Sequence, residues 1–222
     1  MARTIKPLRR ILRYMRPNKN SFTLIEITTA MFLTAILVGS LTIVFNTGIK
    51  AYRQGKDIME IARKAQLILG QMTKELSAAM VQEDYIPFEG SSSYVYFMAP
   101  VENSSDLDLC ELGYYFDSAN TEIDRHFITS GSGYFEYPAS IETYTRITSE
   151  PTFCEDVTAL SLQYYNGSTS GWQSTWTSTD DNTNNLPQMV SVTVTIQGKY
   201  GNPPQTRTFS TYIYLPNSTG NT

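Results

Sequence analysis

The first twenty or so residues are basic and polar, and the chain then turns sharply apolar. Residues 22–45 read FTLIEITTAMFLTAILVGSLTIVF, in which Glu26 is the only charged residue. At about 1.5 Å of rise per residue, a helix of this length crosses the roughly 30 Å hydrocarbon core of a bilayer. Its threonine hydroxyls can bond back to the preceding turn and do not interrupt a helix. The pattern predicts a membrane-spanning helix over residues 22–45.

A different apolar pattern follows, with apolar residues recurring every three or four positions. They are Ile58, Ile61, Ala65, Ile68, Met72, Leu76 and Ala79. This spacing is typical of one face of an amphipathic helix. No proline lies between Ser21 and Ile86. We therefore expect one helix from about Phe22 to about Met80, in which residues 46–80 form a stalk with charged residues on its other faces.

From Tyr85 onward the apolar period shortens to two, which is typical of strands. The expected strands are Ser93–Ala99, Glu111–Asp117, Arg125–Thr129, Val157–Tyr165, Met189–Gln197 and Arg207–Leu215. The last two alternate cleanly and flank a turn rich in Gly and Pro, which predicts an antiparallel pair. We expect an α+β fold, with the long N-terminal helix packed on an antiparallel β-sheet head formed by residues 81–222.

Charge is divided unevenly along the chain. The first twenty residues carry seven cations and no acid, whereas the whole chain has a net charge of -4, which leaves about -11 on the rest. Cations before an apolar span place the N-terminus in the cytoplasm and the bulk of the chain across the membrane. The acidic head argues against nucleic acid as a partner, because nucleic-acid binding needs a basic face.

The chain has two cysteines, Cys110 and Cys154, and no CxxC pair that would indicate zinc. If the head lies outside the cytoplasm, an oxidising compartment favours a disulfide between them. The alternative is two free, buried thiols. We expect the disulfide.

The stretch SFTLIEI, residues 21–27, resembles the prepilin motif of type IV pilins and type II secretion pseudopilins. In that family a prepilin peptidase cuts before the Phe and N-methylates the new terminus. The resemblance implies cleavage between Ser21 and Phe22, removal of residues 1–21 as a basic leader, and N-methylation of Phe22. The family prefers Gly before the cut. Ser21 is small, so the resemblance implies processing here too, at a slower rate.

The resemblance also implies a role for Glu26, since a carboxylate inside a bilayer is costly without a partner or a function. Cleavage frees an amine at Phe22, and in a filament the amine of one subunit would pair with Glu26 of its neighbour. Without the motif, an acid so close to the membrane boundary could simply extend to the aqueous interface. An uncleaved signal anchor, the other explanation of the apolar run, does not account for Glu26.

The C-terminal half is similar to J-type minor pseudopilins. There a strand ending in Tyr165 is followed by Trp172, Trp176, the pair Leu186-Pro187 and a Val-rich strand. The resemblance implies a non-enzymatic pseudopilus subunit of the inner membrane, single-pass, with its head in the periplasm. The implied partners are the peptidase, other minor and major pseudopilins, and secreted proteins. Minor type IV pilins share much of this pattern and remain an alternative.

No motif in the head indicates an active site or a cofactor. His126 is the only histidine, and no nucleophile-elbow, zincin, P-loop or EF-hand pattern occurs. Asp106 and Asp108, or Asp180 and Asp181, could contribute to a calcium site, but loop acids are usually solvated. We therefore expect no catalytic residue and no metal. A membrane-tethered enzyme or binding module is the remaining alternative.

Overall fold

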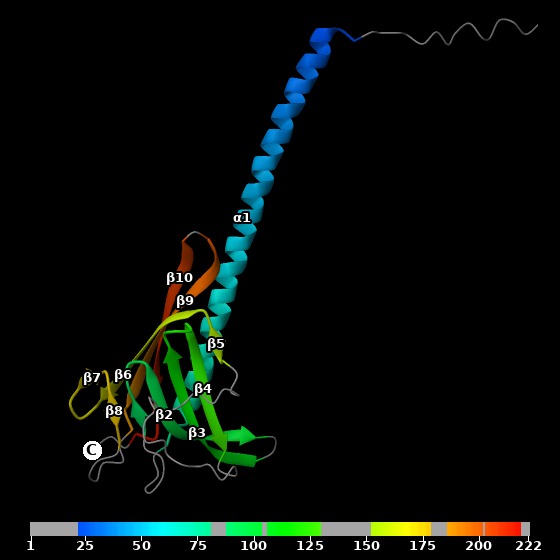
Figure 1. The fold of residues 1–222 in the computed structure, drawn as a ribbon. Helices are drawn as coiled ribbons and strands as arrows, with labels where there is room; N and C mark the ends of the chain where they lie inside the picture. Colours follow the sequence, from blue (N-terminus) through cyan, green and yellow to red (C-terminus); the bar gives the residue numbers. More distant parts are fainter. Residues whose placement is uncertain are drawn as a thin grey trace, which may run out of the picture. The chain divides into compact units, whose positions relative to one another are not determined.

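The computed structural model describes residues 22–80, 88–103, 106–129, 152–178, 186–201 and 203–218. The chain divides into two compact units, one ending at Ala51 and the other beginning at Tyr52. Within the described ranges, the elements in chain order are α1 (Leu24–Leu76), β1 (Glu89–Gly90), β2 (Tyr94–Asn103), β3 (Asp106–Asp117), β4 (Glu122–Thr129), β5 (Cys154–Glu155), β6 (Val157–Asn166), β7 (Gly171–Gln173), β8 (Trp176–Thr177), β9 (Met189–Gly201) and β10 (Pro204–Tyr214). Figure 1 shows these elements coloured along the sequence.

The strands form two antiparallel sheets. The first has the order β5-β4-β3-β2-β1-β8, and the second has the order β10-β9-β6-β7. In the second sheet, β10 pairs with β9 over almost its whole length, from Pro204 opposite Gly201 to Tyr214 opposite Met189. The long helix and the antiparallel sheets confirm the α+β architecture expected from the sequence.

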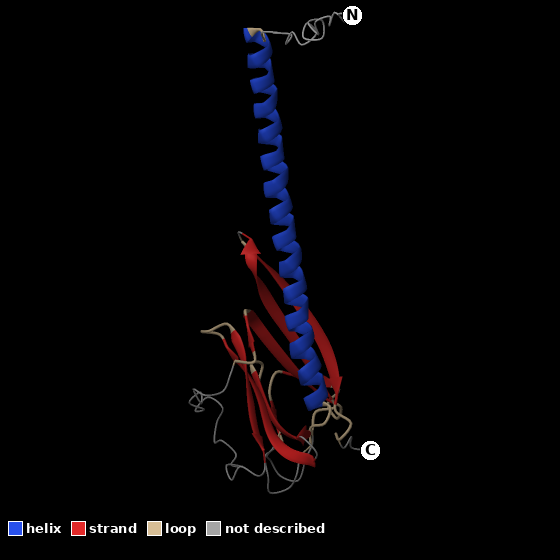
Figure 2. Ribbon diagram, turned by 90° about the vertical axis from the view of Figure 1, so that its right-hand side faces the viewer, coloured by secondary structure: helices blue, strands red, loops and turns tan. Residues whose placement is uncertain are grey.

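Apolar side chains from α1 and from both sheets form one core. The helix contributes the stripe Ile61, Ala65, Ile68, Met72 and Leu76, all buried. In β9 the alternate residues Val190, Val192, Val194 and Ile196 are buried, and in β2 Val95, Phe97 and Ala99 are buried. Figure 2 shows strands alongside the C-terminal part of the helix. The stripe predicted for the stalk is therefore the face that packs on the sheets.

A buried tyrosine ties the two sheets together. The Tyr164 hydroxyl from β6 lies between the carbonyls of Ser91 and Tyr94, at 3.0 and 3.1 Å. The ring reaches this position because residue 90 is glycine. A β-carbon on Gly90 would lie only 2.1 Å from the Tyr164 oxygen.

All six predicted strands are present, although their bounds differ. The strand expected at Glu111–Asp117 begins at Asp106, and the one expected at Arg125–Thr129 begins at Glu122. The helix ends at Leu76 rather than near Met80. The short strands β1, β5, β7 and β8 were not predicted, because two or three residues carry no readable alternation.

The disulfide expectation is wrong, because Cys110 and Cys154 are both free and buried. Cys110 in β3 lies opposite Thr129 of β4, whereas Cys154 in β5 lies opposite Ile123 of the same strand. The two cysteines therefore flank β4 at positions six residues apart, which corresponds to about 20 Å along the strand. A disulfide needs α-carbons within about 7 Å.

Candidate functional site

The predicted processing site lies at the start of the described chain. Ser21 and the expected leader lie outside the described residues, and so does one side of the expected cleavage bond. Phe22 is 75% exposed and precedes the first residue of α1 by two positions. Glu26 lies in the first turn of the helix.

Thr23 and Glu26 cap the N-terminus of α1. The Thr23 hydroxyl accepts a hydrogen bond from the Glu26 amide at 3.3 Å, and the Thr23 amide donates to Glu26 Oε2 at 3.2 Å. This reciprocal pair is a capping box, which satisfies two amides that a helix terminus otherwise leaves without partners. The sequence carries the signal for this cap as Thr-x-x-Glu, which the expectations above did not include.

Beyond the cap, the first half of α1 is apolar and exposed. Among the described residues it forms the only candidate membrane span, judged by its length and apolar composition. The hydroxyls of Thr29, Thr34 and Thr42 donate to carbonyls four residues earlier, as the sequence predicted. These bonds remove the polar cost of threonine in an apolar setting.

One side of this half-helix combines the acid with small side chains. A shallow hollow along it is lined by Phe22, Glu26, Ile27, Ala30, Met31, Thr34, Ala35 and Val38. Small residues spaced four apart let a second helix approach closely. Among the described residues no cation pairs with Glu26, whose carboxylate contacts only Thr23. This face could therefore accept both an apolar helix and a positive charge.

Two other acids of α1 lie in the second unit and are buried. The charged residues of the stalk were expected on its polar faces, but Asp57 and Glu75 are only 2% and 3% exposed. Asp57 accepts backbone hydrogen bonds from Lys199 at 2.8 Å and Tyr200 at 3.4 Å. Gly198 permits this approach, because a β-carbon there would lie 2.0 Å from an Asp57 oxygen. Asp57 thus fastens the helix to the end of β9.

Glu75 is held by a partly buried arginine and a buried tyrosine. Its carboxylate accepts hydrogen bonds from Arg125 of β4 (Nε to Oε2, 3.2 Å), from Tyr114 of β3 and from Gln71. Burial and the Glu75 charge raise the pKa of Tyr114. Burial lowers the pKa of Arg125, but Glu75 outweighs it and the net shift is upward. The cluster joins α1 to the first sheet.

A third link is an ion pair between Lys64 and Asp156. The Lys64 Nζ lies 2.5 Å from Asp156 Oδ2, and Lys199 Nζ lies 3.6 Å from the same oxygen. Partial burial raises the pKa of Asp156, but the two lysines lower it by more, so the net shift is downward. Asp156 has a φ of 65°, a conformation that Asp and Asn adopt more readily than other non-glycine residues.

Glu111 and His126 form a buried pair on the face of the first sheet that does not join the core cluster. Glu111 is fully buried, its Oε1 lies 3.8 Å from His126 Nε2, and neither carboxylate oxygen has a hydrogen bond within the described part of the chain. Burial raises the pKa of Glu111 to about 7 and lowers the pKa of His126 to about 4. Both groups are therefore neutral between those values, which explains how an acid tolerates this position.

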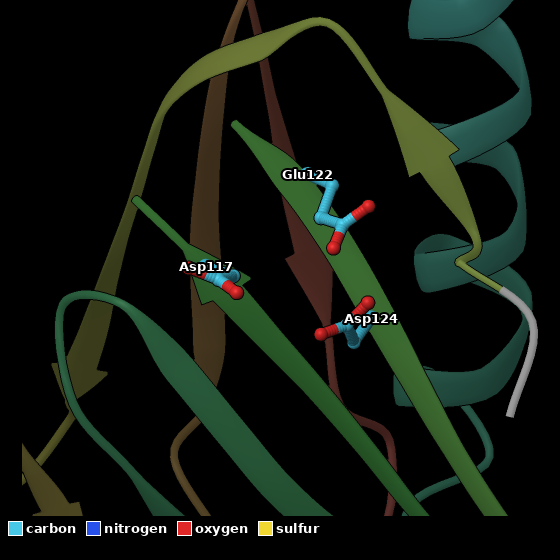
Figure 3. A group of neighbouring side chains, drawn as sticks. All are labelled: Asp117, Glu122 and Asp124. Atoms are coloured by element: carbon cyan, nitrogen blue, oxygen red, sulfur yellow. The ribbon is translucent and has the colours of Figure 1, made fainter. Parts of the chain in front are cut away.

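Three carboxylates gather at the β3–β4 turn, as Figure 3 shows. One oxygen each from Asp117, Glu122 and Asp124 lies within 4.8 Å of the others. Asp117 and Glu122 each accept hydrogen bonds. Asp117 accepts the amide of Ala119 at 2.8 Å, and Glu122 accepts the Thr152 hydroxyl at 2.9 Å. The set could offer oxygen ligands to a cation, and Asp117 also stabilises the turn by accepting the amides of Ala119 and Asn120.

The other acids considered from the sequence are not placed at this turn. Asp106 begins β3 at the far end of the strand from Asp117. Asp180 and Asp181 lie outside the described residues.

Comparison of the chain with protein-family models, with curated proteins and with solved structures finds no match. The geometry and the sequence motif therefore carry the functional argument.

Proposed function

We propose that this chain is a minor pseudopilin of a type II secretion system, a structural subunit rather than an enzyme. The observation that carries the proposal is the arrangement at the start of α1. Glu26 lies four residues after Phe22, at the head of an apolar half-helix, and the basic leader precedes both. The prepilin peptidase would cut between Ser21 and Phe22 and methylate Phe22.

Assembly would then use the exposed side of α1 that carries Phe22 and Glu26. The freed amine of an incoming subunit would pair with Glu26 of its neighbour, while the small side chains Ala30, Thr34 and Ala35 allow the helices to pack closely. Pairing two charges in an apolar setting is favourable only when both partners are present. This requirement would fix the axial position of each subunit in the filament.

The capping box gives Glu26 a second role that must be separated from pairing. A glutamine at this position can still reach back to the Thr23 amide, because capping boxes accept Glu or Gln. It cannot pair as an anion with an amine. Glu26→Gln therefore removes the charge and keeps the cap, whereas Thr23→Ala weakens the cap and keeps the charge.

The decisive experiment combines processing and assembly. Intact-mass measurement of membrane-extracted protein should show loss of residues 1–21 and the gain of one methyl group. Cross-linking to other pseudopilins through the N-terminal helices should fall strongly in Glu26→Gln and persist in Thr23→Ala.

An intact Met1 terminus in cells with an active peptidase would overturn the proposal. So would normal assembly of the Glu26→Gln variant, because the cap alone would then explain the acid. A membrane-tethered enzyme or binding module would be indifferent to both substitutions.

A further inference from the structure

The four outer edges of the two sheets differ greatly in length. Three of them are formed by very short strands: β5 and β8 have two residues each, and β7 has three. The fourth edge is β10, with eleven residues. Short edge strands are one of the ways in which proteins avoid unwanted pairing. Among the edge strands that the structure describes, β10 is the longest.

The backbone of β10 has a defined open side. The Leu215 amide donates to the Gln188 carbonyl at 3.0 Å, continuing the β9–β10 ladder. Hydrogen-bonded pairs alternate in an antiparallel ladder, so Ile213, Thr211 and Phe209 also face β9. The N–H and C=O groups that point away from β9 therefore belong to Thr208, Ser210, Tyr212 and Tyr214.

β10 lacks the usual features that block pairing. Between Thr206 and Tyr214 it contains no proline, and its only charged residue is Arg207. The register shift in its pairing is confined to the end near Pro204. Charged side chains, prolines and bulges are the devices that normally protect an edge, and apart from Arg207 this stretch has none of them.

The side chains beside the open edge are uncharged and partly aromatic. Tyr212 and Tyr214 are 69% and 63% exposed, and the Tyr212 ring lies 5.7 Å from that of Trp172. Next to them the hydroxyls of Ser210 and Thr208 bond to Thr193 and Thr195 of β9, at 2.9 Å each. Exposed tyrosine and tryptophan with few charges are typical of the centre of a protein interface.

We propose that β10 is a docking edge for an extended, uncharged β-strand of a partner protein. The partner's backbone would pair with the open groups of Thr208, Ser210, Tyr212 and Tyr214, extending the second sheet by one strand. Its alternate side chains would lie on the same face as the two tyrosines, where threonine, β-branched and aromatic residues fit best. This proposal concerns the head alone and does not depend on the proposed function.

Binding is measured on the full chain in detergent micelles. The probe is a fluorescein-labelled peptide of alternating threonine and valine, about nine residues long to match an ordinary strand. A second peptide of the same sequence is N-methylated at alternate amides, so it cannot complete a ladder. Fluorescence anisotropy should show saturable binding of the first peptide and none of the second.

The matched variants are Ser210→Pro and Ser210→Ala. Both remove the hydroxyl that bonds Thr193, but only proline removes the outward N–H, and an edge strand tolerates proline there. Loss of a backbone hydrogen bond together with the clash of the ring should weaken peptide binding at least about tenfold. Ser210→Ala should bind like the wild type.

Hydrogen exchange on the unmodified chain tests the proposal without any variant. The peptide should slow exchange of the amides of Thr208, Ser210, Tyr212 and Tyr214. Unchanged exchange at these amides, or full peptide binding by Ser210→Pro, would overturn the proposal.

Two other occupants would also overturn it. One is a second copy of the chain, which would appear as a peptide-independent dimer in sedimentation that Ser210→Pro abolishes. The other is a neutral glycan. In that case dextran would bind, Trp172→Ala would abolish this binding and Ser210→Pro would not change it. If the peptide also failed to protect the β10 amides, the aromatic face would be a sugar-binding surface.

Discussion

The two halves of α1 have similar backbone structure but opposite surroundings. Residues from Leu24 to Phe45 expose nearly all of their large apolar side chains, whereas Ile61, Ile68 and Met72 are almost fully buried. The acids differ in the same way: Glu26 contacts only the helix cap, while Asp57 and Glu75 bind groups from distant strands. One half of a helix can therefore be stabilised by packing on the sheets of its own chain, while the other half still requires an apolar environment or partner proteins.

The largest effect should follow truncation of the buried stripe. Ile68→Ala should lower the free energy of unfolding of the head by about 4 kcal/mol, because it removes a buried side chain and leaves a cavity. Leu37→Ala, at an exposed position, should change it by less than about 0.5 kcal/mol. Urea unfolding in detergent, followed by fluorescence of Trp172 and Trp176, measures both. Equal losses would mean that the two halves do not differ as described.

The next effect concerns the ion pair between buried Glu75 and partly buried Arg125 at the end of α1. Glu75→Gln should cost about 3 kcal/mol, because Arg125 would remain largely buried without a counter-charge. Glu60→Gln is the matched control on the same helix, since Glu60 makes only long contacts of 4.0 Å with Lys64 and Lys199. The same unfolding measurement applies. A small loss for Glu75→Gln would show that the pair contributes little to holding the helix on the first sheet.

A smaller effect is expected where α1 meets β9. Asp57→Ala should cost about 2 kcal/mol, because it leaves the amides of Lys199 and Tyr200 without their acceptor. Hydrogen exchange of these two amides should accelerate, while that of Val192 and Val194 in the middle of the strand should not. Asp57→Asn keeps one acceptor oxygen and should show a weaker effect. Unchanged exchange in Asp57→Ala would rule out this fastening.

The smallest effect is a dependence of stability on pH. Lys64 and Lys199 lower the pKa of Asp156 in the folded protein. The ionised carboxylate therefore stabilises the fold at pH values above the ordinary aspartate pKa of about 3.9, and this stabilisation is lost as the pH falls through the lowered pKa of the folded state. Asp156→Asn should remove less than about 1 kcal/mol at pH 6, since the pair is partly exposed. The difference from the wild type should shrink at pH 3. Thermal unfolding at both pH values tests this, and a constant difference would contradict it.

The sequence predicted elements well where a period repeats over many residues. The stripe from Ile61 to Leu76 and the alternation from Val190 to Ile196 each repeat several times, so one face was identifiable in advance. No repeating pattern in the sequence indicates whether Cys110 and Cys154 lie close enough to form a disulfide. Cysteine content and compartment do not reveal that the cysteines flank β4 at positions about 20 Å apart along the strand.

The sequence by itself determined the long helix, the six longer strands, the pairing of the last two, and the unusual position of Glu26. These features depend on local spacing and on residue type, which the linear chain displays directly. The tertiary structure decided that Asp57 and Glu75 are buried, that Glu111 lies beside His126, and that β10 is the longest edge strand among the described strands. These features depend on contacts between segments that lie tens of residues apart in the chain. The sequence does not reveal which strand will supply the partner of a polar residue that lies beside an apolar stripe.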